Sequence, residues 1–252
     1  MTTAEEIYAA LDEWAPFDTQ EGFDNSGLLI GSMEQPVERC LLALDLTPEV
    51  CAEAVRCGAQ MAVTHHPVIF TPLKSLRPDS AVYRAVQAGL AVLCAHTNLD
   101  KAPGGVSDTL ADLLGLSRAD DLEGGDGFVK LGDLPRPVTG GELAALVKER
   151  LGLSHLRIHD AGRPIRTIAL CSGSGGSYLE LAAEAGADAF VTGDVKHDRA
   201  VEAAALGITL IDAGHYETEA IILEPMREYL QERFPRVEFR RAESDRPPFR
   251  WE

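Results

Sequence analysis

The sequence contains few basic residues and no long apolar run, and each shortage excludes a class of protein. Its 23 lysines and arginines are outnumbered by 40 aspartates and glutamates, which gives a net charge of −17. A surface this acidic repels the phosphates of nucleic acids and of anionic membranes, so we expect neither as a partner. No stretch approaches the roughly 20 apolar residues that a membrane-spanning helix needs.

The sequence also lacks the closely spaced cysteine pairs that bind metals or form redox sites. The five cysteines are scattered, and no two of them form a Cys-x-x-Cys pair. Isolated cysteines in odd number predict free, mostly buried thiols, and they argue against disulfides and against a zinc–thiolate site. The first residues are acidic and lack the basic and apolar regions of a signal peptide, so we expect a cytoplasmic protein.

Short apolar segments alternate with helical ones along the first half of the chain. Residues 39–45, 59–64 and 90–95 are predicted strands, and helices separate them. One of these helices opens with Thr47-Pro48-Glu49, which supplies an N-cap, a first-turn proline and a first-turn acid. This β-α-β order predicts an α/β fold with mostly parallel sheets.

The second half of the chain repeats the pattern of the first. Residues 58–66 align with residues 186–194, because both segments place a glycine–alanine pair before an apolar strand. Unrelated β-α-β units also share such a pair, so a duplication and a coincidence both stay open. The duplication is favoured by two pairs with the same His-x-x-x-acid spacing, His96 with Asp100 and His215 with Glu219.

The repeat predicts two similar α/β lobes. The glycine-rich, acidic stretch 121–127 is the best candidate for a linker between them. We therefore predict a first lobe over residues 1–124 and a second over residues 125–252, whose C-terminal part packs back on the first lobe. We expect a metal site in the cleft between the two lobes.

Two adjacent histidines, His65 and His66, follow the apolar end of a predicted strand. In open α/β sheets, ligands and catalytic groups collect where strands end. Neighbouring side chains on a strand point to opposite faces, but both rings can aim at one pocket where the chain turns, and Pro67 marks such a turn. Two histidines in a row can also be a surface feature, although the apolar run before them favours a buried metal site.

The two His-x-x-x-acid pairs are weak signals when taken singly. Residues 96–100 are also typical of a capped turn, and His215 with Glu219 forms only half of a His-Glu-x-x-His zinc motif. Together, however, these side chains are enough for two divalent ions in one pocket, and zinc, manganese and iron all suit the donor set. Such a pair of ions can activate water and polarise a substrate oxygen, which suits hydrolysis.

A glycine–serine loop follows the predicted strand that ends near residue 170. Its residues Ser174, Gly175, Gly176 and Ser177 could bind an anionic group of a substrate through backbone amides. Tight packing of a strand on a helix explains the same composition equally well, and the Gly-Lys-Ser/Thr ending of a Walker loop is missing. His197 could reach the same cleft or be a solvated histidine.

Taken together, these motifs resemble one family, the hexameric proteins with dinuclear metal centres known as GTP cyclohydrolase 1 type 2 homologues. The resemblance covers nearly the whole chain and is to the short bacterial form. It rests on Asp24-Asn25-Ser26-Gly27, Ala43-Leu44-Asp45, Thr64-His65-His66-Pro67, Ala95-His96-Thr97-Asn98-Leu99-Asp100, Gly173-Ser174-Gly175-Gly176, Thr192-Gly193-Asp194 and Gly214-His215-Tyr216-Glu217-Thr218-Glu219.

The resemblance implies a protomer that assembles into a toroidal homohexamer and binds two divalent metal ions per chain. We predict a dinuclear-metal-dependent hydrolase that acts on GTP or another purine nucleotide, with His96 as a catalytic residue near the substrate. The alternative is a non-enzymatic metal-binding scaffold whose ring binds another protein. In either case, the ligands that the resemblance implies are His65, His66, Asp100, His215 and Glu219.

Overall fold

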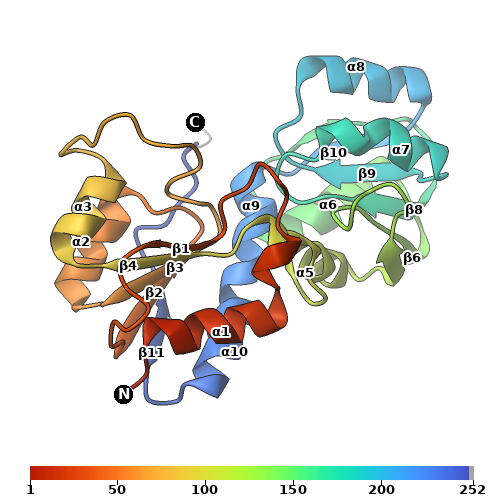
Figure 1. Cartoon of the computed structure of the whole chain (residues 1–252). Helices are drawn as coiled ribbons and strands as arrows, with labels where there is room; N and C mark the ends of the chain where they lie inside the picture. The colour runs from red at the N-terminus through yellow and green to blue at the C-terminus, as the bar shows by residue number, and fades with distance from the viewer. Residues whose placement is uncertain (250–252) are drawn as a thin grey trace. The chain divides into compact units, whose positions relative to one another are not determined.

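The computed structural model describes residues 1–249 and divides the chain into two compact α/β units (Figure 1). The first unit comprises Met1–Pro103 and Ile222–Arg246, and the second comprises Gly104–Ile221 together with residues 247–249. The first change of unit therefore follows Pro103 rather than residue 124. The reason is that α5 (Val106–Leu114) buries Leu110 and Leu114 in the apolar core of the second unit.

The first unit contains a five-stranded sheet whose strand order is β1-β4-β3-β2-β11. Strands β2, β3, β4 and β11 run parallel to one another, and β1 joins the edge of β4 in the antiparallel sense. β3 and β4 are buried at every residue, as expected for strands covered on both faces. The strands span Gly27–Ile30 (β1), Arg39–Ala43 (β2), Met61–Thr64 (β3), Ala91–Cys94 (β4) and Glu238–Arg241 (β11).

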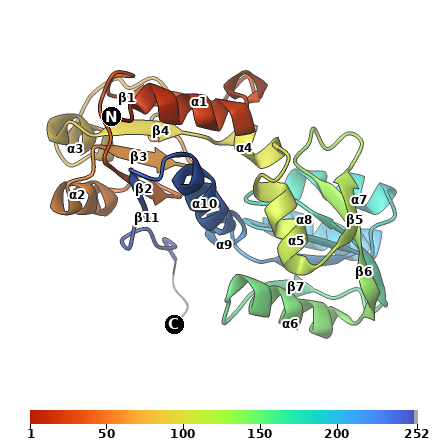
Figure 2. The ribbon, with the colours of Figure 1, turned by 90° about the horizontal axis from the view of Figure 1, so that it is seen from below.

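Helices cover both faces of this sheet. Helices α2 and α3 pack side by side on one face, and α1 and α10 lie on the other (Figures 1 and 2). The start of α2 follows its sequence signal, because the Thr47 hydroxyl accepts a hydrogen bond from the Val50 amide and Pro48 occupies the first turn. The helices span Ala4–Trp14 (α1), Pro48–Cys57 (α2), Ala81–Ala88 (α3), Thr97–Lys101 (α4) and Leu223–Arg233 (α10), with a short 3₁₀ turn at Phe17–Thr19.

The second unit contains a six-stranded mixed sheet of order β5-β6-β8-β9-β10-β7. The parallel arrangement that the sequence predicts is found here in β8, β9 and β10, whereas β5, β6 and β7 pair in the antiparallel sense. The strands span Ser117–Asp121 (β5), Lys130–Val138 (β6), Arg157–His159 (β7), Ile165–Leu170 (β8), Ala189–Thr192 (β9) and Thr209–Asp212 (β10).

The second sheet is also covered on both faces. Helices α7 and α8 pack on one face, while α5 and α6 pack together on the other (Figure 1). Within residues 1–249, no helix combines the length and the apolar character needed to cross a bilayer. The remaining helices span Gly140–Leu151 (α6), Leu179–Glu184 (α7), His197–Leu206 (α8) and His215–Glu219 (α9), with 3₁₀ turns at Gly176–Tyr178 and Ala220–Ile222.

The two units share one internal order of elements. In the first unit β2, α2, β3, α3, β4 and α4 follow one another, and in the second β8, α7, β9, α8, β10 and α9 do so. The three parallel strands also have the same neighbours, since β3 lies between β2 and β4 as β9 lies between β8 and β10. The aligned segments 58–66 and 186–194 contain β3 and β9, which favours duplication over coincidence.

Candidate metal centre

Three histidines of the first unit gather at the carboxyl ends of two parallel strands. His65 and His66 directly follow β3, and His96 follows β4 as the residue before α4. One ring nitrogen from each histidine lies within 4.8 Å of one from each of the others. The ring centroids are 5.2 to 5.5 Å apart. His96, which the sequence predicts as a catalytic residue, therefore lies among the predicted ligands of this unit.

Each of these rings is held by its Nδ1 atom. His65 Nδ1 lies 2.9 Å from the Ala95 carbonyl oxygen. His66 and His96 place Nδ1 at 2.9 Å from Asp45 Oδ1 and at 2.8 Å from Asp24 Oδ1, respectively. Carbonyl and carboxylate oxygens can only accept, so Nδ1 carries the hydrogen in all three rings. A neutral ring then presents Nε2 as a lone pair, the arrangement in which histidine binds metals.

Asp24 is the most tightly held of these acceptors. Its side chain is fully buried. Burial alone would raise the pKa of this carboxyl group, but hydrogen bonds from His96 and Thr97 outweigh that effect and hold the pKa well below its usual range. Asp24 is therefore an anion at neutral pH, and its hydrogen bond fixes the orientation of His96. The sequence motif Asp24-Asn25-Ser26-Gly27 contains this residue, but its pairing with His96 was not predicted.

Asp100 adds a buried carboxylate to the three rings. It lies on α4 and is 6% exposed. Its Oδ1 atom accepts no hydrogen bond within residues 1–249 and lies 3.3 Å from His65 Nε2. Since His65 donates through Nδ1, two lone pairs face each other across this gap in the neutral ring. A divalent cation between imidazole nitrogen and carboxylate oxygen satisfies both atoms, so the residues present fit a metal ion.

The second unit carries a matching pair on α9. His215 begins this helix and Glu219 ends it, so the two side chains lie one turn apart on the same face. His215 Nδ1 lies 2.8 Å from Asp194 Oδ2, and His215 Nε2 lies 3.0 Å from Glu219 Oε2. With the Nδ1 hydrogen given to Asp194, either a second proton on the ring or a cation would satisfy the Nε2–carboxylate contact.

Gly173 shapes the surroundings of this pair. A Cβ atom at residue 173 would lie 1.9 Å from Glu219 Oε1, and φ at this residue is +57°, in the left-handed region that favours glycine. The Gly173 amide donates to Thr218 Oγ1 at 2.9 Å. The glycine at the start of the glycine–serine loop therefore packs directly against a predicted metal ligand.

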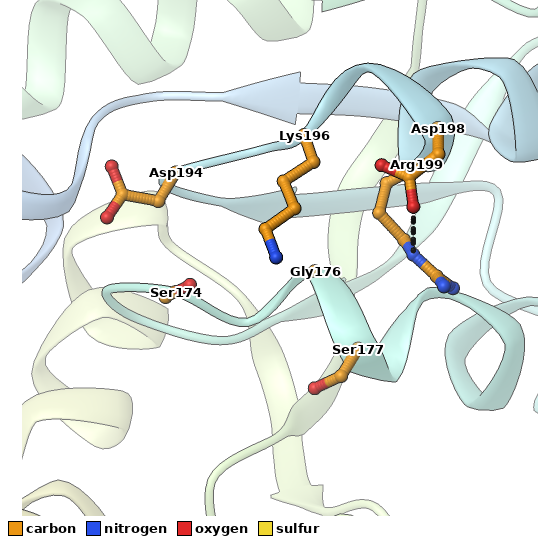
Figure 3. Close-up of a pocket in the computed structure, with 7 residues that line it drawn as sticks. All are labelled: Ser174, Gly176, Ser177, Asp194, Lys196, Asp198 and Arg199. Carbon is orange, nitrogen blue, oxygen red and sulfur yellow. Dashed lines mark ion pairs between the residues drawn. The ribbon is translucent and has the colours of Figure 1, made fainter.

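The other predicted residues of this loop separate into two groups. Ser174, Gly176 and Ser177 line a pocket of about 310 Å³ in the second unit (Figure 3). Gly175 packs against β9 instead, where its amide donates to Thr192 Oγ1 at 2.9 Å. His197 is exposed at the start of α8 and is not among the residues that line this pocket.

Comparison with known proteins places this architecture in a family. The family model described as Duf34/NIF3 (NGG1p interacting factor 3) matches residues 2–248. The chain belongs to this family. Among solved structures, a Bacillus cereus protein related to NIF3 superimposes with a TM-score of 0.92 at 24% identity, covering 100% of this chain and 99% of that one, which confirms the two-lobed α/β fold.

Curated relatives carry the name that the sequence motifs indicated. A Clostridium perfringens protein is 32% identical over 255 residues, covering 97% of each chain, and a Streptomyces coelicolor protein is 37% identical over 234 residues, covering 87% of this chain and 82% of its own. Each is named a GTP cyclohydrolase 1 type 2 homolog. The predicted resemblance of this NIF3-family chain is thereby confirmed.

Proposed function

We propose that this NIF3-family protein is a metal-dependent hydrolase with a dinuclear centre. Its ligands would be His65, His66 and Asp100 from the first unit, with His215 and Glu219 from the second. The observation that carries the proposal is the buried contact of Asp100 Oδ1 with His65 Nε2, at 3.3 Å. Two acceptors that face each other away from water are costly to leave uncompensated, and a bound cation removes that cost.

The composition of the second half-site supports a centre shared by both units. His215 and Glu219 supply two ligands, whereas a zinc ion takes four. Ligands from the first unit would complete the set.

The donor set favours zinc, manganese or iron as the bound ions. All five proposed ligands are histidines or carboxylates, which these metals accept. Cys94 lies near His65, and its Sγ atom donates to the His65 carbonyl oxygen at 3.0 Å. Burial raises the pKa of the Cys94 thiol well above its usual range, and the thiol already donates to a backbone carbonyl, so Cys94 is not among the proposed ligands.

When bound, such ions supply Lewis-acid polarisation of a substrate oxygen and lower the pKa of water. The chain's own contribution is orientation, because each ring is fixed through Nδ1 by a backbone carbonyl or a carboxylate. His96 is the predicted catalytic residue. Asp24 holds its Nδ1 hydrogen, so the opposite ring edge would meet the substrate or a water molecule.

Two exposed aromatic rings support a planar substrate such as a purine nucleotide. Phe70 meets His96 edge-on, with ring centroids 6.3 Å apart. Phe23 lies 6.3 Å from Phe70, and the two phenylalanines are 66% and 47% exposed, respectively. Exposed rings of this kind stack on nucleobases. The names of the relatives make GTP the first nucleotide to test.

The test combines metal analysis with turnover. Protein reconstituted with each of the three metals is incubated with GTP, and the products are identified by mass spectrometry. We expect GTP to be hydrolysed by the metal-loaded protein and to be left intact after chelation and by the His65→Ala variant. Activity that survives complete removal of metal would refute the proposal.

We also propose a homohexamer with a small-molecule substrate. Light scattering on the purified protein should give six times the mass of the chain. The metal-loaded hexamer could instead turn over no nucleotide, phosphoester or amide and retain a stoichiometric protein partner. That result would refute the hydrolase and favour a binding scaffold.

A further inference from the structure

A polar pocket lies wholly within the second unit, at the carboxyl end of β9. Its volume is about 310 Å³, at the lower end of the range for small-molecule sites. The glycine–serine loop after β8 forms one wall, and the segment that leads into α8 forms the other (Figure 3). The lining residues are Ser174, Gly176, Ser177, Asp194, Lys196, Asp198 and Arg199.

Lys196 is the cation in this pocket that has no ion-pair partner within the described residues. Its side chain is exposed and makes no hydrogen bond or ion pair with any of residues 1–249. Figure 3 shows the side chain reaching from the start of α8 toward the loop that carries Ser174 and Gly176. In a protein of net charge −17, carboxylates are abundant, so a lysine directed at a serine–glycine loop instead of an acid is notable.

The other charged groups of the pocket are already engaged. Asp194 accepts the Nδ1 hydrogen of His215 at 2.8 Å. Arg199 lies 3.7 Å from Asp198 and donates to Glu202 at 2.6 Å. The pocket therefore combines two paired carboxylates with one cation that lacks a counter-ion.

Two hydroxyl groups in the same pocket can donate hydrogen bonds alongside this cation. Ser174 and Ser177 both line the pocket, and neither hydroxyl makes a hydrogen bond within the described part of the chain. An ammonium group with neighbouring hydroxyl donors is the chemistry that binds a phosphate group, whose oxygens accept several hydrogen bonds at once.

We propose that this pocket binds a phosphate group, with Lys196 as the principal contact and the two serines as further donors. The inference deepens the proposed hydrolase, because Asp194 both lines the pocket and orients His215. A phosphate bound here would lie beside a carboxylate that positions a proposed metal ligand. Phosphate binding itself, however, requires none of the metal ligands.

The experiment measures binding to metal-free, full-length protein by isothermal titration calorimetry. Chelation removes ions that would otherwise bind phosphate themselves, and metal content is measured on the same samples. The probes are inorganic phosphate, guanosine 5′-monophosphate and guanosine. We compare wild type with Lys196→Gln and with Lys148→Gln, a matched loss of charge on α6.

We expect wild type and Lys148→Gln to bind phosphate or the nucleotide saturably. Guanosine, which has no phosphate, should bind to wild type and Lys148→Gln no more tightly than to Lys196→Gln. Lys196→Gln should weaken phosphate binding at least about tenfold, as loss of a charge-assisted contact requires. A nucleotide that binds more tightly than inorganic phosphate marks a substrate phosphate, whereas phosphate alone marks a free-anion site.

Absence of binding to metal-free wild type, or equal binding by wild type and Lys196→Gln, would overturn the inference. These outcomes are separate from those of the hydrolase proposal. A protein that binds metal and hydrolyses GTP but shows no effect of Lys196→Gln refutes only the phosphate site. A protein without bound metal that loses phosphate binding in Lys196→Gln refutes only the hydrolase.

Discussion

Replacement of Asp100 by asparagine should change the stability of the metal-free and the metal-bound protein in opposite directions. In the wild type, Asp100 Oδ1 and His65 Nε2 face each other at 3.3 Å as two acceptors. An asparagine at this position offers an amide N–H, which can donate to Nε2 after a shift of a few tenths of an ångström. The same change removes an anionic ligand from the proposed centre.

The expected magnitudes follow from these two effects. A net hydrogen bond stabilises a folded protein by about 1 kcal/mol. For a chain of this size that corresponds to a rise of roughly 2–4 °C in the unfolding temperature of chelated Asp100→Asn. Metal at 100 times its dissociation constant stabilises the wild type by about 2.7 kcal/mol, and we expect the variant to lose most of this gain.

Differential scanning calorimetry on chelated and metal-saturated samples measures both effects. Asp112→Asn is the matched control, since Asp112 is exposed on α5 and loses the same charge. Two results would refute the reasoning. One is a chelated Asp100→Asn that unfolds at a lower temperature than the chelated wild type. The other is a variant that keeps the full stabilisation by metal.

Three further predictions concern the surroundings of the centre. Gly173→Ala should destabilise the protein by about 1–3 kcal/mol in chemical denaturation and weaken metal binding, because the new methyl group would overlap Glu219 Oε1; an unchanged midpoint would contradict the packing described. Asp24→Asn should destabilise the protein at neutral pH. Because the pKa of Asp24 is lowered in the folded state, its contribution is fully present above its unfolded pKa of about 3.9 and is lost as pH falls below that value, so the gap between variant and wild type should close in acid; a gap that is constant with pH would refute this. Phe70→Ala should raise KM for a nucleotide substrate without lowering metal content, and an unchanged KM would exclude stacking on this ring.

Local signals in the sequence were sufficient for the parallel core of each unit. The apolar strands and the N-cap at Thr47 depend on neighbouring residues, and the structure places them where the pattern predicts. The antiparallel part of the second sheet was less readable. β6 contains Pro135 and Pro137, which obscure a strand pattern, and its pairing with β8 shifts register between Asp133 and Val138.

The glycine-rich stretch 121–127 shows what a turn signal leaves open. It predicts a change of chain direction, and the structure has a turn there, with the Leu122 amide donating to the Val129 carbonyl oxygen at 2.9 Å. The turn joins β5 to β6 inside the second unit. Glycines mark where a chain turns, but which core the flanking segments join depends on long-range packing.

The candidate site was predictable in its histidines but not in the groups that hold them. His65, His66 and His96 stand out because they follow apolar strands. Asp24 lies 72 residues from its partner His96, and Asp45 lies 21 residues from His66. No local spacing encodes such contacts, because they arise only when the sheet brings separate strand ends together.

The most direct test of a metal centre built from both units is the metal content of purified protein by elemental analysis. Wild type is compared with His66→Ala, which alters the first unit, and with Glu219→Ala, which alters the second. The account predicts about two divalent ions per chain in the wild type and a loss of metal in each variant. Wild type without metal, or full metal content in either variant, would contradict it.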